Sequence, residues 1–353
     1  MSASPSDAQP VVHAIHENPD WFGPSADAFR ERGIPYREWL LTDGGAVDLD
    51  EPPPPGVYWS RFSASSHTRG HALAKEHTRA VLAWAAAAGR RVVNGRSALE
   101  AEVSKVVQLA TLRRHGLEVP RTTAVVGTAD LLAAARGLVA RTGGPFLTKH
   151  NQGGKGLGVA RFDDVGAFAA ALAAGDVPTP VDGVTLLQEY VPPADGTITR
   201  VELVAGELVY AIRADTVHGG FQLCPADACA LDPLTGAPLL PPGAQLAPVP
   251  GQSLFSLDAE FGTRPGEDAL LAGYRAVLAE LGVEIAGVEH LRAADGRVLT
   301  YDVNTNTNYN AEVEAVAPRS GPGAIADHLG ALLRAEVARS AVGHAGVAPP
   351  AGR

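Results

Sequence analysis

The chain has 353 residues, of which 46% are hydrophobic, and a formal net charge of −10. This composition is enough for two or three buried cores, contains no apolar run long enough for a membrane helix, and is too acidic for a nucleic-acid partner. Its 2 cysteines make no disulfide framework, so we expect a cytoplasmic protein with no membrane partner, whose polar residues 1–10 form a disordered start rather than a signal peptide.

Residues 11–95 alternate between strands and helices. Apolar runs at 11–15, 57–62 and 91–93 predict strands, and the segments 25–32 and 71–88 predict helices, which indicates a parallel α/β sheet. Hydroxyl and guanidinium groups follow the second strand. They are candidates for binding a substrate carboxylate, although the same pattern is typical of a capped helix start: Arg61, Ser63, Ser66 and Arg69.

Residues 96–183 form a second unit. The pattern Ser97–Glu100 is a capping box, which predicts one helix that ends at Gly116. Strands are predicted at 120–126, 146–149 and 159–162, with helices near 128–141 and 164–174.

Residues 184–340 form a third, mostly β unit, and we expect residues 341–353 to be a disordered tail. Strands are predicted at 184–191, 198–204, 207–213, 283–291 and 298–303, and helices at 267–281 and 324–340. Residues 215–258 are loop-rich, which indicates a functional or disordered segment. Their Cys224 and Cys229 lack the spacing and additional ligands of a zinc site.

A glycine-rich loop lies between two strands of the second unit. It fits neither the Walker A pattern nor the dinucleotide fingerprint, and a plain hairpin loop is the alternative to phosphate binding. Its backbone N–H groups and lysine suit phosphate oxygens, which makes these residues candidates: Gln152, Gly153, Gly154, Lys155, Gly156 and Gly158. The chain has only four lysines, a scarcity that codon bias explains, yet Lys105, Lys149 and Lys155 all fall in this unit.

The hairpin around Asp295-Gly296 predicts a metal site. A two-residue turn there places Glu289 directly opposite Asp302, with Asn304 on the same face. Like charges in opposite positions destabilise a hairpin unless a cation lies between them, and carboxylate and amide oxygens suit Mg²⁺. An exposed hairpin that tolerates two acids is the alternative.

A second hairpin, around Ala205-Gly206, predicts an anion site. With a two-residue turn, Arg200, Glu202 and Arg213 share one face, and the two arginines are diagonal neighbours. An anion such as a phosphate or acyl phosphate relieves their repulsion. Two solvated arginines are the alternative.

The order of these motifs resembles the ATP-grasp superfamily, in particular glutamate-ligase-type carboxylate–amine ligases. The resemblance covers about residues 57–335 and also rests on Gln188-Glu-Tyr-Val191, Gly287-Val-Glu-His-Leu291 and Tyr301-Asp-Val-Asn304. It implies an ATP-grasp fold, α/β with α+β lobes, behind an N-terminal parallel α/β domain. The boundaries are then 11–95, 96–183 for the small lobe and 184–340 for the large lobe.

The resemblance also implies roles for individual residues. Lys105 and Lys149 contact the nucleotide, and the glycine-rich loop covers its phosphates. The hinge Glu189-Tyr190-Val191 binds adenine through its backbone. Lys155, Arg200 and Arg213 act on the transferred phosphate and the oxyanion, and the ligands of Mg²⁺, expected as two ions, are Glu289, Asp302 and Asn304.

Three positions depart from the family. Ile198-Thr-Arg200 replaces an Asp-x-Arg pattern, Asp302 stands where Glu is commoner, and Thr305–Asn310 replaces a small-Pro-Gly run. The last change makes Asn306 and Asn308 candidates for a changed substrate site. We therefore expect an ATP-dependent ligase that joins a small-molecule acid to an amine through an acyl phosphate, with a homodimer left open. A kinase for a hydroxyl group and a non-catalytic ATP-binding module are the alternatives.

Overall fold

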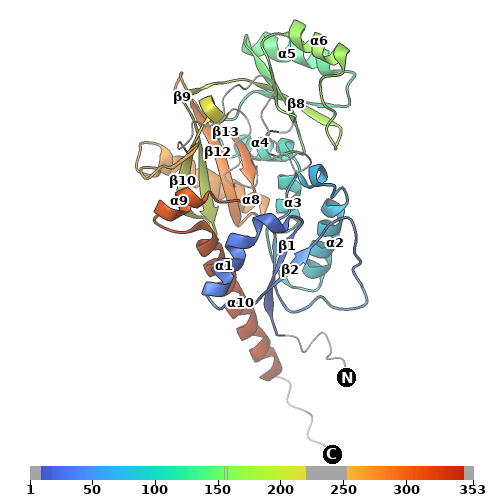
Figure 1. Ribbon diagram of the computed structural model, residues 1–353, viewed down its shortest axis with the longest axis vertical. Coiled ribbons are helices and arrows are strands. Elements are labelled where there is room, and N and C mark those ends of the chain that lie inside the picture. The colour runs from blue at the N-terminus through green and yellow to red at the C-terminus, as the bar shows by residue number, and fades with distance from the viewer. Residues whose placement is uncertain (1–8, 155, 157, 220–252, 346–353) are drawn as a thin grey trace, which may run out of the picture.

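The computed structural model describes residues 9–154, 156, 158–219 and 253–345, which form three sheets (Figure 1). The first sheet is parallel, with the order β2-β1-β3-β4. It is built from β1 (Val11–His16), β2 (Tyr36–Leu40), β3 (Gly56–Ser60) and β4 (Arg91–Val93). The predicted parallel sheet is confirmed, but β2 was not predicted, because its half-exposed Tyr-Arg-Glu-Trp-Leu sequence has no apolar alternation.

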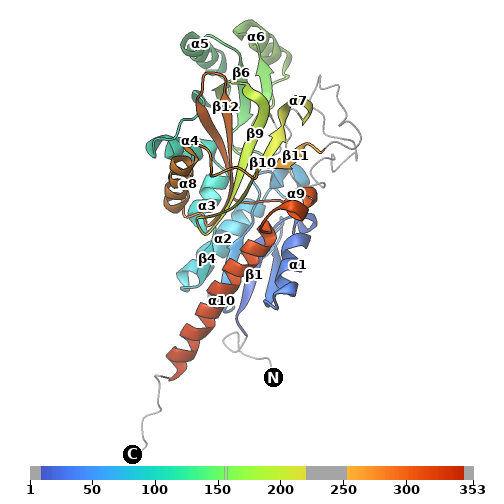
Figure 2. The ribbon, with the colours of Figure 1, turned by 90° about the vertical axis from the view of Figure 1, so that its left-hand side faces the viewer.

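Helices cover both faces of the first sheet. They are α1 (Gly23–Glu31), α2 (Ala74–Ala87) and the long C-terminal helix α10 (Gly321–Ala345), with short 3-10 turns η2 (Pro19–Trp21) and η3 (Ser66–Arg69). Phe29 of α1 and Leu329 of α10 are fully buried in one core together with Val12. Beyond this core, α10 projects away from the body of the molecule (Figure 2).

The second sheet is antiparallel, with the order β5-β8-β6-β7. Its strands are β5 (Thr122–Val126), β6 (Phe146–His150), β7 (Ala160–Phe162) and β8 (Val184–Glu189), and α5 (Leu131–Thr142) and α6 (Val165–Ala174) pack on it. The sequence places β8 at the start of the large lobe. The structure instead pairs β8 between β5 and β6, because it continues the small-lobe sheet before the chain crosses the hinge.

The third sheet is antiparallel, with the order β11-β10-β9-β12-β13. Its strands are β9 (Pro193–Val204), β10 (Glu207–Asp215), β11 (Phe255–Leu257), β12 (Ile285–Ala293) and β13 (Val298–Asn304). One face packs against α3 (Arg96–Glu102), α4 (Lys105–Arg114) and α8 (Glu267–Leu281) around the buried Tyr274. The remaining helices are α7 (Thr216–Gly219) and α9 (Ala311–Val316).

The single helix predicted from Ser97 to Gly116 is wrong, because the chain breaks it into α3 and α4. Ser104 caps α4 by accepting a hydrogen bond from the Val107 N–H, whereas α3 begins without a side-chain cap. Asn151, at the base of the glycine-rich loop, also accepts a hydrogen bond from the Val106 N–H, at 2.9 Å. The break therefore places Lys105 at the first position of α4, held next to the loop.

Within the described ranges, no helix is long and apolar enough to cross a membrane.

Candidate functional site

The predicted pairing of Glu289 with Asp302 is confirmed, although the turn that predicted it is different. The Ala293 N–H donates to the Arg297 carbonyl at 2.9 Å, so the connection has three residues rather than two. Near the turn the register is therefore shifted by one, with His290 opposite Thr300. A bulge at Tyr301 adds one residue to β13 and restores the expected register, which leaves Glu289 opposite Asp302.

Each of the two carboxylates already holds a cationic side chain. Lys105 Nζ lies 2.5 Å from an Asp302 oxygen, and Arg200 Nη1 lies 3.2 Å from a Glu289 oxygen. The Asn304 amide also donates to Glu289, at 3.2 Å. Burial and, next, the charge of Asp302 raise the pKa of Glu289, so a further positive charge between the two acids would stabilise both as carboxylates.

This set of two carboxylates and one amide fits Mg²⁺ by the chemistry of its donors. Hard oxygen ligands from one or two carboxylates, completed by phosphate oxygens and water, are typical of Mg²⁺ sites. The described residues hold no group of three or more His, Cys, Asp and Glu side chains placed for a metal. The set could therefore hold Mg²⁺ only together with oxygens that the ligand brings.

Lys149 reaches the same place from the small-lobe sheet. Its Nζ lies 5.0 Å from the centre of the Tyr301 ring, on the bulge of β13. Burial and the nearby Lys105 lower the pKa of Lys149 to about 8, while Asp302 and Glu289 oppose this shift. Two lysines and two acids, from the four separate elements α4, β6, β12 and β13, thus converge between the lobes.

An apolar cluster lies on the same face of the large-lobe sheet as Glu289. The buried members are Ile198, Ala214, Leu291, Ala293 and Leu299, with Val191, Phe255 and Tyr301 packed against them. Ile198 is two residues from Arg200 on β9, and Leu291 is two residues from Glu289 on β12. A ligand that carries both a flat apolar group and a polyanion could bind to this face. Its apolar group would pack on the cluster, and its polyanion would lie on the side of Glu289 and Arg200.

The hinge has part of its backbone in use. The Glu189 N–H donates to the Arg121 carbonyl at 2.8 Å, and the Tyr190 N–H donates to the Pro145 carbonyl at 3.0 Å. The Glu189 carboxylate accepts from the Arg121 N–H at 2.8 Å. These contacts fix the hinge between the lobes and leave Val191, which borders the apolar cluster, as the hinge residue beside the site.

The prediction that Arg213 shares a face with Arg200 and Glu202 is wrong. A bulge at Val209 shifts the register of β10, so Ile212 lies opposite Arg200 and Arg213 lies opposite Thr199. A shift of one residue turns every following side chain to the other face. The opposite face of β10 therefore carries Arg213.

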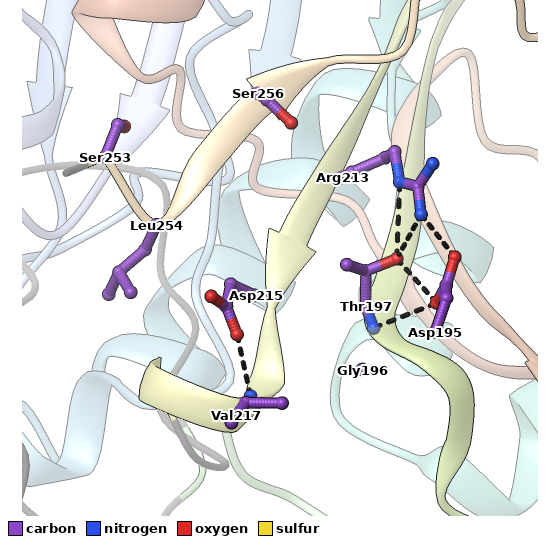
Figure 3. Close-up of a pocket in the computed structure, with 9 residues that line it drawn as sticks. All are labelled: Asp195, Gly196, Thr197, Arg213, Asp215, Val217, Ser253, Leu254 and Ser256. Carbon is purple, nitrogen blue, oxygen red and sulfur yellow. Dashed lines mark hydrogen bonds and ion pairs between the residues drawn. The ribbon is translucent and has the colours of Figure 1, made fainter.

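Arg213 lines a polar cavity there of about 310 Å³ (Figure 3). Its guanidinium donates to the Thr197 hydroxyl at 3.0 Å and forms an ion pair with Asp195. The lining residues are Asp195, Gly196, Thr197, Arg213, Asp215, Val217, Ser253, Leu254 and Ser256. The cavity and the carboxylates of Glu289 and Asp302 lie on opposite faces of the sheet.

Arg200 and Glu202 share one face of β9, as predicted, and the structure places Glu289 directly opposite Arg200 on that face. Arg200 Nε donates to Glu202 at 2.6 Å, and Arg200 Nη2 is buried with no hydrogen-bond partner among the residues that the structure describes. Burial opposes the charged form, but Glu202 and Glu289 together raise the pKa of Arg200. Gly287 makes room for the guanidinium, since a Cβ on Gly287 would lie 2.5 Å from Nη2.

The first-unit candidates separate into two groups. Arg61 is 3% exposed, and its guanidinium donates to the carbonyls of Trp21 and Thr307 at 3.1 and 3.0 Å and to the Asn308 side chain at 3.3 Å. These contacts leave no surface of Arg61 for a substrate carboxylate, so Arg61 fits a structural role. The Asn308 side chain is one of its hydrogen-bond partners. The Asn306 amide oxygen is buried without a partner.

Ser63, Ser66 and Arg69 lie in a second group, at the end of β3. The Ser63 and Ser65 hydroxyls are 2.9 Å apart, and Arg69 donates to Ser65 at 3.1 Å. Ser66 is buried and starts the turn η3. Unlike Arg61, Arg69 is half-buried, and its partner Ser65 lies next to Gly154 of the glycine-rich loop.

The glycine-rich loop lies against this segment of the first unit. Gln152 is 3% exposed, and its side chain joins Lys75 at 3.0 Å and the Ala64 carbonyl at 3.4 Å. Gly154 is next to Ser65, and Gly153, Gly156 and Gly158 complete the described part of the loop. Lys155, predicted to act on the transferred phosphate, lies outside the described residues, as do Cys224 and Cys229.

Three residues near the site were not predicted from the sequence. Buried Glu102 accepts from the Thr305 and Ala64 N–H groups at 2.8 and 3.1 Å and so joins the end of β13 to the first unit. Glu17 pairs with Arg69, and Lys75 contacts the loop. The scarcity of lysine was a signal for Lys75, whereas single acids give no such signal.

Comparisons with known proteins agree with this architecture. No family model and no curated protein sequence matches the chain. Among solved structures, the D-cycloserine synthetase DcsG superposes with a TM-score of 0.62 at 20% identity, over 91% of this chain and 99% of that one. The ATP-grasp ligase PsnB, complexed with a minimal precursor, gives 0.62 at 17%, over 92% and 100%.

A third match is D-alanyl-alanine synthetase A from Vibrio cholerae, with a TM-score of 0.60 at 9% identity, over 93% of this chain and 100% of that one. PsnB has also been solved with Mg and ADP. The chain therefore has the ATP-grasp fold, as the order of its motifs predicted.

Proposed function

From this fold, we propose that the chain is an ATP- and Mg²⁺-dependent ligase that joins a carboxylate to an amine and releases ADP and phosphate. One observation carries the proposal: Lys105, Lys149, Glu289 and Asp302 converge between the lobes, beside an apolar cluster at the hinge. The similarity to a D-cycloserine synthetase, to a D-alanyl-alanine synthetase and to an ATP-grasp ligase solved with a precursor peptide supports the reaction class.

Each group has a role in binding the nucleotide. The apolar cluster and Val191 hold adenine, and Lys105 and Lys149 bind phosphate oxygens, together with the backbone N–H groups of the glycine-rich loop. Glu289, Asp302 and Asn304 would hold Mg²⁺, which when bound would neutralise charge on the transferring phosphoryl group. Lys105 then exchanges its contact with Asp302 for a phosphate.

The chemistry takes two steps. A carboxylate oxygen of the acid attacks the γ-phosphorus, the bond from that phosphorus to the oxygen of ADP breaks, and an acyl phosphate forms. The amine nitrogen then attacks the acyl carbon, phosphate leaves with the bonding electrons, and the nitrogen loses one proton. Arg200 stabilises the oxyanion of this second step, because its Nη2 is a buried donor without a partner on the metal face.

Water would hydrolyse the acyl phosphate, so the site must be covered during the reaction. The glycine-rich loop, with Lys155, is the proposed cover. Slower amide exchange over residues 150–160 with Mg-ATP than without it would support this role. Exchange that does not change at saturating nucleotide would contradict it.

Hydroxylamine trapping tests the reaction class, because hydroxylamine converts an acyl phosphate into a hydroxamate. We expect a hydroxamate from ATP, Mg²⁺, hydroxylamine and the correct acid, and equal amounts of ADP, phosphate and amide with the correct amine. A stable phosphorylated alcohol would indicate the kinase, and nucleotide binding without turnover would indicate a binding module. AMP and pyrophosphate would indicate adenylation and refute the acyl phosphate.

The two arginines give a further discrimination. Arg200→Lys keeps the charge but loses the planar fork, so we expect slower amide formation. Arg213→Lys, on the other face of the sheet, is the matched variant and should have little effect. If the Arg213 variant is the slow one, the face assignment of the two arginines is wrong.

A further inference from the structure

The carboxyl ends of β1 and β3 form a site that the proposed reaction has not yet used. In the order β2-β1-β3-β4, the chain leaves β1 and β3 toward opposite sides, which makes their junction a topological switch point. Ligands of open parallel sheets bind outside the carboxyl ends of the strands at such points. Glu17 follows β1 directly, and the segment Arg61–Ser66 follows β3.

Four basic side chains gather at this junction, here called the basic cluster: His67, Arg69, His71 and Lys75. All four are half-buried. The cluster contacts one carboxylate, Glu17, which is 1% exposed and pairs with Arg69 at 2.5 Å and His71 at 3.0 Å.

The charges of the cluster do not balance. Glu17 neutralises one of the two permanent cations, Arg69 and Lys75. After burial, the factors that lower the pKa of His67 are all cationic: His150, Arg69 and Lys75. A local positive excess in a chain of net charge −10 indicates an anion site, because like charges this close repel unless an anion joins them.

The basic cluster is coupled to the proposed phosphate loop. Lys75 Nζ donates to the Gln152 side chain at 3.0 Å, and Gln152 donates to the Ala64 carbonyl at 3.4 Å. A Cβ on Gly154 would lie 3.7 Å from the Ser65 Cβ. A group bound at the cluster would therefore lie under the same loop that covers the nucleotide.

We propose that the acid substrate carries a second anionic group, and that Lys75 and Arg69 of the basic cluster bind it. This inference rests on the proposed ligase reaction, in which the reacting carboxylate lies by the metal ligands and Arg200. The cations of the basic cluster are then available to bind another anionic group on the same substrate molecule. Dicarboxylic and phosphorylated acids are the classes that fit.

Matched acids test the preference. L-Glutamate is compared with L-glutamine, L-aspartate with L-asparagine, succinate with succinamate, and L-phosphoserine with L-serine, by hydroxamate formation with ATP and Mg²⁺. We expect the member with the second anion to give at least about tenfold higher kcat/KM, because its second anion forms charged hydrogen bonds that the neutral member of the pair lacks. Equal rates within every pair that reacts would refute the second anion site but leave the ligase reaction standing.

Lys75→Met identifies the residue, with Arg79→Met, one turn further along α2, as the control. Arg79 pairs with Glu76 at 2.6 Å, away from Gln152. We expect Lys75→Met to raise the KM of the preferred acid about tenfold or more, leave the KM of ATP near that of the wild type, and remove the preference for the second anion. Arg79→Met should change none of these.

Two other outcomes would overturn the inference. A rise in the KM of ATP alone would show that the basic cluster serves the nucleotide phosphates. Hydroxamate from none of these acids, together with ATP hydrolysis that no acid stimulates, would reject the ligase proposal itself and the inference with it.

Discussion

Replacing Arg61 by methionine should destabilise the first unit rather than weaken substrate binding. The variant removes donors to the Trp21 and Thr307 carbonyls, at 3.1 and 3.0 Å, and to Asn308, at 3.3 Å. It also removes a cation that lies 5.3 Å from the centre of the Trp59 ring. The acceptors stay buried and lose their partners.

The magnitude follows from two opposing terms. Three hydrogen bonds from a charged donor contribute about 4–9 kcal/mol in total. Burial lowers the pKa of Arg61 to about 10. A fall of this size from the usual value corresponds to a cost of about 3 kcal/mol for burying the charged guanidinium, and a buried methionine does not carry that cost. We therefore expect Arg61→Met to lower the free energy of unfolding by about 1–6 kcal/mol, the difference between these two terms.

Tryptophan fluorescence during urea unfolding measures this loss directly, because all 4 tryptophans, Trp21, Trp39, Trp59 and Trp84, lie in the first unit. Arg37→Met is the control, since Arg37 is exposed on β2 of the same sheet and should shift stability by no more than about 0.5 kcal/mol. Unchanged stability of Arg61→Met, combined with a higher KM for the acid, would refute the structural role and restore Arg61 as a substrate ligand.

Three further predictions concern the site between the lobes. Glu289→Gln and Asp302→Asn should each abolish turnover but keep the fold, because each removes a charge from the proposed metal site; wild-type activity of either purified variant would exclude the metal assignment. Gly287→Ala should slow turnover at least about tenfold, since its Cβ would lie 2.5 Å from Arg200 Nη2 and overpacking costs about 1–3 kcal/mol; normal kinetics would mean that the guanidinium moves away freely. Lys149, with a pKa of about 8 without ligand, should take up a proton when phosphates bind above pH 8, so Mg-ADP affinity should fall by up to about tenfold per pH unit above that value. Calorimetry in buffers of different ionisation heat measures this uptake, with Lys149→Met as the control, and equal heats in all buffers would argue against it.

The sequence by itself determined most of the elements and most of the residues of the candidate site. Apolar runs and glycine stops predicted α8 with its exact bounds and all strands of the large lobe except β11, because these signals are local. The like-charged pair Glu289 and Asp302 indicated a cation, and the scarcity of lysine drew attention to Lys105 and Lys149. These features depend on residue type and short spacing, which a single sequence contains.

The tertiary structure alone decided which face each side chain occupies. One bulge, at Tyr301, offset a wrongly predicted turn and left Glu289 opposite Asp302, while another, at Val209, turned Arg213 away from Arg200. A single inserted residue reverses the faces of a strand without leaving a mark in its hydrophobic pattern. Contacts between distant segments were equally hidden: Arg61 meets the Thr307 carbonyl 246 residues away, and Lys75 meets Gln152 77 residues away. Such partners are fixed by how the three sheets pack together, and no local pattern of residues encodes them.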